Sequence, residues 1–79
     1  MEFYYVMTVV HQPRSGVLGY GTKYGTYQAE NGATRESVFT DIRTRVAASI
    51  GISPESMNVL FFSLEPNKIP MVTPNAERG

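Results

Sequence analysis

The distribution of apolar and β-branched residues predicts two extended segments at the start of the chain. Residues 3–10 are dense in aromatic and β-branched side chains, which suit a pleated surface. Residues 17–27 are predicted to form a second strand. Pro13 and Gly16 lie between them in a stretch with turn chemistry. Residues 3–27 are therefore predicted to form a hairpin.

Helical spacing begins after Thr34, the predicted N-cap of the only long helix. The apolar residues that recur on one helical face are Val38, Phe39, Ile42, Val46 and Ile50. Ser37 stands where a strict capping box has Glu or Gln, so that box is not expected. Asp41 and Arg45 form a predicted i,i+4 pair, and Gly51 is the expected stop.

A short turn and a third strand complete the predicted elements. Ser53-Pro54-Glu55 predicts one helical turn, and residues 58–64 predict a strand that ends at Pro66. We therefore expect a single ββαβ domain over residues 1–67. Residues 68–79 are expected to form an extended or frayed tail.

The order β-β-α-β indicates an α+β fold with one sheet and one helix packed on one face of it. A right-handed crossover places the third strand beside the first, in spatial order 2-1-3. The first strand is apolar on both faces, with Phe3, Tyr5, Met7 and Val9 on one and Tyr4, Val6 and Val10 on the other. The third strand is predicted to place Leu60, Phe62 and Leu64 on one face and Val59 and Phe61 on the other.

One helix covers only one face, so the sequence predicts an apolar patch that needs a cover. The candidates are the tail, a second copy of the chain or a different protein. The tail offers little area in Ile69, Met71 and Val72, and we favour a homodimer that associates through the sheet face or edge. The alternative is that Tyr4 and Phe61 are ordinary surface aromatics.

The second predicted strand allows two interpretations. Gly19, Gly21 and Gly25 share one face with Lys23, whereas Tyr20 and Tyr24 lie on the other. Bases of single-stranded nucleic acid stack on such tyrosines, with Lys23 and Arg14 as cations. The structural interpretation is that the glycines admit large side chains from the adjacent strand, and the zero net charge favours it.

Composition argues against catalysis and against cofactor or metal binding. The 79 residues include no cysteine, which excludes disulfides and thiolate chemistry, and a single histidine, His11, which is expected to be an exposed loop residue. The seven carboxylates are spread out, and no serine lies in a G-x-S-x-G motif. Glu2 precedes the apolar start where a signal peptide has basic residues, so we expect a cytoplasmic protein without a membrane segment.

Two resemblances add to this picture. The helix stop at Gly51-Ile52, the Pro54 turn and the strand from Asn58 resemble the β-grasp pattern of ubiquitin-like domains over residues 3–64. The chain lacks that family's final strand and terminal Gly-Gly, so the resemblance implies the fold and argues against a modifier role.

The second resemblance is to small uncharacterised proteins of actinobacteria and their phages or mobile elements. It is carried by Tyr4-Tyr5-Val6-Met7-Thr8, by Gly32-Ala33-Thr34-Arg35 and by the segment from Val59 to Asn67. It implies a short accessory protein that acts by binding.

The sequence therefore predicts a non-enzymatic protein-interaction module that associates with itself, and single-stranded nucleic-acid binding is the alternative function. The predicted contact residues are Tyr4, Phe61, Tyr20, Tyr24 and Arg14. Arg14 is included because a cation at a loop tip is well placed to meet an acidic partner.

Overall fold

The computed structural model describes residues 1–12, 16 and 18–69. Its elements are the strands β1 (Glu2–His11), β2 (Gly19–Gln28) and β3 (Met57–Pro66), the helix α1 (Arg35–Ser49) and the 3-10 turn η1 (Pro54–Ser56). Every predicted element is present, and the strand ends differ from the predicted ones by at most two residues. Of the predicted tail, Lys68 and Ile69 are exposed, and residues 70–79 lie outside the described residues.

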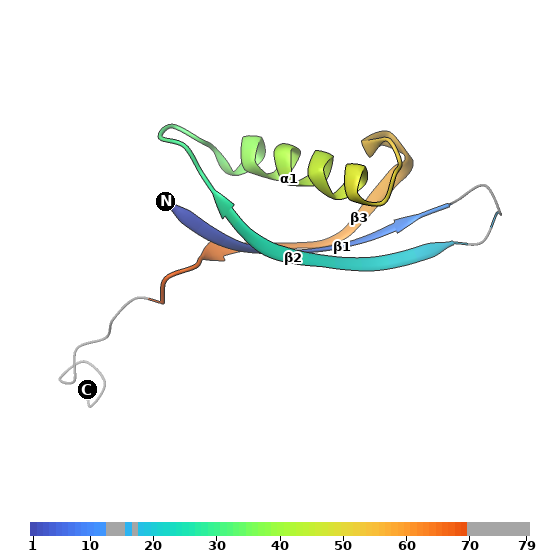
Figure 1. The fold of residues 1–79 in the computed structure, drawn as a ribbon, viewed down its shortest axis with the longest axis horizontal. Helices are drawn as coiled ribbons and strands as arrows, with labels where there is room; N and C mark the ends of the chain where they lie inside the picture. The colour runs from blue at the N-terminus through green and yellow to red at the C-terminus, as the bar shows by residue number, and fades with distance from the viewer. Residues whose placement is uncertain (13–15, 17, 70–79) are drawn as a thin grey trace, which may run out of the picture.

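The three strands form one antiparallel sheet in the order β2-β1-β3, which confirms the predicted α+β class and strand order. The sheet bows along its strands, and α1 lies within the concave side (Figure 1). The convex side carries no helix (Figure 1). The sheet is thus one layer of a two-layer domain whose second layer covers a single face.

Both ends of α1 are closed by local hydrogen bonds. The Ser37 amide donates to Thr34 Oγ1 over 3.1 Å, and the Thr34 amide donates to Ser37 Oγ over 3.0 Å. The expectation that no capping box forms is therefore wrong, because the short serine hydroxyl reaches back as Glu or Gln would. At the other end Gly51 has φ +75°, and the Ile52 amide donates to Ala47 O, as in a Schellman stop.

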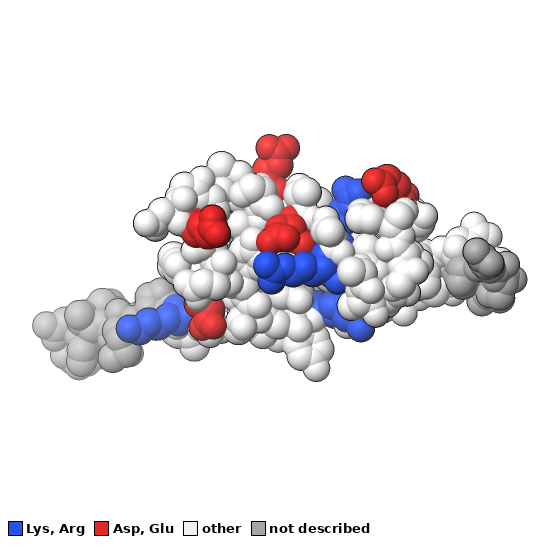
Figure 2. Space-filling model, turned by 45° about the horizontal axis from the view of Figure 1, so that its top comes forward, with Lys and Arg blue, Asp and Glu red and all other residues white. Residues whose placement is uncertain are grey.

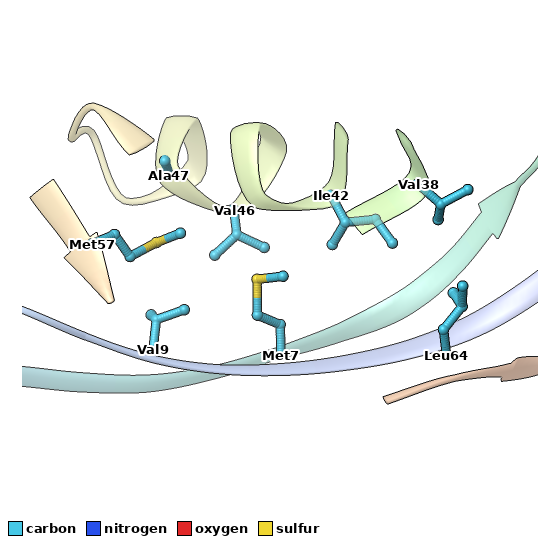
Figure 3. Packing of buried hydrophobic residues seen from close by; sticks show 8 residues of the cluster. All are labelled: Met7, Val9, Val38, Ile42, Val46, Ala47, Met57 and Leu64. Atoms are coloured by element: carbon cyan, nitrogen blue, oxygen red, sulfur yellow. The ribbon is translucent and has the colours of Figure 1, made fainter. Parts of the chain in front are cut away.

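The core lies between α1 and the concave face of the sheet (Figure 3). Its buried members are Met7, Val9, Val38, Ile42, Val46, Ala47, Met57 and Leu64. Phe39 of α1 and Phe62 of β3 extend it with an edge-to-face contact, at 5.1 Å between ring centroids. The predicted apolar face of the helix is confirmed, because three of its five members are fully buried and two pack at the margin.

A β-bulge in β3 overturns the predicted alternation of that strand. Thr8 pairs with Phe61, but the next residue of β1, Val9, pairs with Val59, so Leu60 is an extra residue without a partner. Because the bulge shifts the alternation by one position, Val59 joins the core side. Leu60 is then 57% exposed beside Phe61 rather than buried with Phe62.

Two glycines of β2 make room for large side chains of β1, as the structural interpretation predicts. A Cβ on Gly19 would lie 2.8 Å from Nε2 of His11, and a Cβ on Gly25 would lie 3.5 Å from the Tyr5 ring. The expectation that His11 is an exposed loop residue is wrong. It is the last residue of β1, half-buried, and its Nδ1 is buried without a hydrogen-bond partner among the described residues.

Candidate interaction surface

The convex side of the sheet, which we call the open face, is where the predicted contact residues gather. Side chains on paired residues point to the same side, so the cross-strand register assigns each strand's contribution. Four rows of the face span all three strands: Thr26–Tyr4–Glu65, Tyr24–Val6–Ser63, Thr22–Thr8–Phe61 and Tyr20–Val10–Asn58, in the order β2-β1-β3. The pair Gln28–Glu2 extends the face beyond Tyr4. Leu60 adds to the third strand at the bulge.

Four of the five predicted contact residues lie on this one face. The exposed fractions are 38% for Tyr4, 69% for both Tyr20 and Tyr24, and 55% for Phe61. Since an aromatic side chain presents some 150–250 Å², these four leave roughly 450 Å² of aromatic surface in water. That is as large as the largest patch on a typical monomer. Arg14 lies outside the described residues.

The side chains in the middle of the open face are small and uncharged. Thr8 and Thr22 share a hydrogen bond of 2.9 Å between their hydroxyls, which pairs β1 with β2 through side chains as well as backbone. Val6 and Val10 lie on either side of Thr8 along β1, and both are half-buried. The face is therefore apolar at its centre, with its hydroxyls partly satisfied internally.

Charge is nearly absent from the open face, which weakens the nucleic-acid interpretation. Lys23 pairs with Met7 and so lies on the helix side of the sheet, opposite Tyr20 and Tyr24. Within the described part of the open face, the charged residues are Glu2 and Glu65, and both are acidic. On the helix side of the molecule, basic and acidic side chains are interspersed (Figure 2). Among the described residues, no cation lies on the open face beside the tyrosines to hold a phosphate backbone.

The helix side carries a polar cluster that fastens α1 to β2. The Tyr27 hydroxyl donates to Asp41 Oδ2 over 2.5 Å, and Arg45 donates to the same oxygen over 3.2 Å. The Arg45 guanidinium also lies over the Tyr27 ring, 4.9 Å from its centroid. The hydrogen bond to Asp41, aided by partial burial, raises the pKa of Tyr27 above its usual value. The predicted Asp41–Arg45 pair is confirmed, and Tyr27 is a partner that helical spacing did not indicate.

Two hollows mark the surface. One of about 380 Å³ opens on the open face above Val10, where Leu18, Tyr20, Asn58 and Leu60 surround it. The other, of about 290 Å³, lies where α1 begins, between Phe3, Val38 and Leu64. That volume is slightly below the range of small-molecule sites, and the residues that line it bring no acid–base pair or nucleophile with an activating base.

The described ranges contain neither a metal-binding cluster nor a helix long and apolar enough to cross a membrane. Among residues 1–12, 16 and 18–69, no three His, Cys, Asp or Glu side chains are grouped so as to hold a metal ion. In the same ranges, α1 and η1 are too short or too polar to serve as a membrane-spanning helix.

Comparison with known proteins gives no relative from which to argue. No protein-family model, no curated protein and no solved structure matches the chain. The surface must therefore be interpreted from its own geometry.

Sequence reasoning missed one member of the open face. Leu60 was expected in the core, and no glycine or proline marks the bulge that turns it outward. It is 57% exposed and lies beside the hollow above Val10, so it belongs to the open face.

Proposed function

We propose that the chain is a non-enzymatic protein-interaction module whose partner is a second copy of itself, bound through the open face. The observation that supports this function is the cluster of exposed aromatic side chains on a face that no element of the described fold covers. A three-stranded sheet packed on one side only gains stability when a second sheet covers the other.

The area of the face suits a modest homodimer. Specific interfaces bury roughly 800 Å² on each partner. The four aromatic residues supply about half of that, and Leu18 and Leu60, each more than half exposed, add to it. Polar residues toward the ends of the face, Thr26, Asn58, Glu2 and Glu65, form a rim, which is the usual anatomy of an interface.

The charge of the face also favours a second copy. The net charge is zero, and the carboxylates of the described face, Glu2 and Glu65, lie together at one end of it, so two copies packed end to opposite end meet without opposing like charges. A partner recognised by charge would need a complementary basic or acidic patch, which the described open face does not present.

The test is the solution mass of the wild-type chain and of Phe61→Glu, measured by light scattering on a sizing column across a dilution series. We expect the wild type at twice the 8.8 kDa chain mass and Phe61→Glu at the chain mass with unchanged helix content. Thr40→Glu is the matched control, because it adds the same charge at an exposed position of α1. A wild-type monomer, or an unchanged mass for Phe61→Glu, would refute the proposal.

The effect of salt distinguishes apolar self-association from nucleic-acid binding. Because the contact is apolar, the mass should be insensitive to added salt, whereas a contact with nucleic acid weakens steeply as salt rises. Retention of a labelled single-stranded oligonucleotide at low salt, lost on adding salt, would favour the alternative function.

A further inference from the structure

The flanking strands of the open face are complementary to themselves, and the central strand β1 distinguishes the possible orientations. In one row the large side chain lies on β2 and the small one on β3, and in the next row this order is reversed. Tyr24 faces Ser63 across Val6, and in the next row Phe61 faces Thr22 across Thr8. Such a pattern lets one copy place its large side chains over the small ones of another.

Two sheets packed face to face are related by a two-fold axis that lies between them. If the strands are to stay nearly aligned, that axis runs either along the strands or across them. An axis along β1 matches Tyr24 with Ser63 and Phe61 with Thr22 on the flanking strands. On the central strand, however, it places Tyr4 of one copy on Tyr4 of the other, and Glu2 on Glu2. It also leaves the hollows above the two Val10 side chains facing each other and empty.

An axis across the strands, between Val6 and Thr8, gives a different match. It carries the row of Tyr4 onto the row of Val10, because the two rows lie equally far from that axis. Tyr4 of each copy then lies over Val10 of the other, at the hollow of about 380 Å³. On the flanking strands Tyr24 meets Thr22, and Phe61 meets Ser63, so every large side chain meets a smaller one.

Resting on the proposed self-association, we infer that the dimer has this axis across the strands and that Tyr4 of each copy fills the partner's hollow above Val10. The two carboxylates of the described face, Glu2 and Glu65, fit this arrangement, because both lie at the same end and the axis carries them to the opposite end of the partner. Glu65 lies in the row of Tyr4, so the axis brings it opposite the neutral Asn58 at the rim rather than opposite another carboxylate. The hollow is thereby part of the interface, not a small-molecule site.

Engineered cysteines distinguish the two axes, because the chain has none of its own. The variant Asn58→Cys/Glu65→Cys carries both thiols on β3, about 20 Å apart within one chain at the rise of a strand. Only an axis across the strands brings Glu65 of one copy over Asn58 of the other. A short bis-maleimide should then link two chains into a covalent dimer. All the altered side chains are exposed and polar.

The comparison sample contains co-expressed Glu65→Cys and Thr26→Cys chains. An axis along the strands brings these two positions together in different copies, whereas the inferred axis holds them about 20 Å apart. We expect covalent dimers from the double variant and none from the mixed sample. Light scattering of each variant before cross-linking confirms that it still associates.

The other outcomes overturn one proposal or both. Cross-linking in the mixed sample alone would assign the axis along the strands, which refutes this inference but keeps the proposed function. A dimer mass with no cross-link in either sample would place the interface off the open face and refute both. A monomer mass for the wild-type chain refutes the proposed function and this inference with it.

Exchanging the side chains at positions 4 and 10 gives an independent test of the inferred contact. Tyr4→Val removes the side chain that fills the hollow, and Val10→Tyr fills the hollow from within, so each should weaken association on the order of tenfold. The double variant Tyr4→Val/Val10→Tyr exchanges the two roles and should recover most of that loss. Equal or greater weakening in the double variant would contradict the inferred contact.

Discussion

Tyr27 of β2 and Asp41 of α1 are joined by a hydrogen bond of 2.5 Å in which the phenol donates to the carboxylate. The contact ties the edge strand of the sheet to the middle of the helix. Arg45, one turn further along α1, neutralises the carboxylate and covers the Tyr27 ring. The helix is thereby fixed on the side of the sheet away from the open face.

Removing the phenolic hydroxyl should measure this link. We expect Tyr27→Phe to lower the free energy of unfolding by about 1 kcal/mol, because the bond to a charged acceptor is lost and the exposed carboxylate regains water. Urea unfolding at a fixed protein concentration gives the value. Tyr5→Phe is the control, since its ring lies over Gly25 and its hydroxyl makes no side-chain hydrogen bond within the described ranges. Equal losses in both variants would assign the effect to general packing.

The same bond predicts an alkaline loss of stability. It raises the pKa of Tyr27 in the folded chain, so its contribution is complete below about pH 10, where the unfolded tyrosine still holds its proton. At higher pH the unfolded state releases that proton first, and the free energy of unfolding falls until the pH passes the raised pKa. Urea unfolding from about pH 8 to 11 should show this fall in the wild type, reduced in Tyr27→Phe. Identical slopes would contradict it.

The fold was predictable where one physical signal dominates. The apolar spacing from Val38 to Ile50 and the stop at Gly51 specify the helix, and the aromatic and β-branched run in residues 3–10 specifies the central strand. A strand that is apolar on both faces also predicted an apolar face that the single helix does not cover. The structure confirms this with Tyr4 on the open face and Met7 in the core.

The rest depends on contacts between distant residues. The Leu60 bulge is set by how β3 meets β1, and Tyr27 and Asp41 meet only when α1 folds over the sheet. His11 turned out half-buried because Gly19, paired with it on the next strand, leaves room for its ring. None of these relationships has a signal within one local segment.

The helix N-terminus offers a third prediction. Thr34→Ala removes the hydroxyl that accepts from the Ser37 amide and should lower the free energy of unfolding by about 1 kcal/mol. Thr40→Ala, at an exposed position inside the same helix, is the matched control and should be neutral or slightly stabilising, because alanine has the higher helix propensity. Urea unfolding of both variants checks the difference, which should vanish if the capping box contributes nothing.

Alanine substitution at two glycines with open space around them should change the free energy of unfolding differently. No atom lies within 4 Å of a Cβ built on Gly51 or on Gly21, so neither substitution produces a clash. Gly51 has φ +75°, a conformation that strains alanine by about 1 kcal/mol, so Gly51→Ala should destabilise. Gly21 lies in β2 with ordinary strand geometry, so Gly21→Ala should be neutral or stabilising. Matching destabilisation by both, in thermal or urea unfolding, would show that backbone conformation is not what distinguishes them.

Self-association predicts that stability depends on protein concentration. When a folded dimer unfolds to two chains, a tenfold rise in concentration adds about 1.4 kcal/mol per dimer to the free energy of unfolding. The urea midpoint of the wild type should therefore rise across a dilution series. That of Phe61→Glu should stay constant, because its carboxylate is unfavourable to bury at the centre of the interface. Thr40→Glu should follow the wild type. A wild-type midpoint independent of concentration, with a monomeric mass, would show that the open face remains in water and that Tyr4 and Phe61 are ordinary surface aromatics.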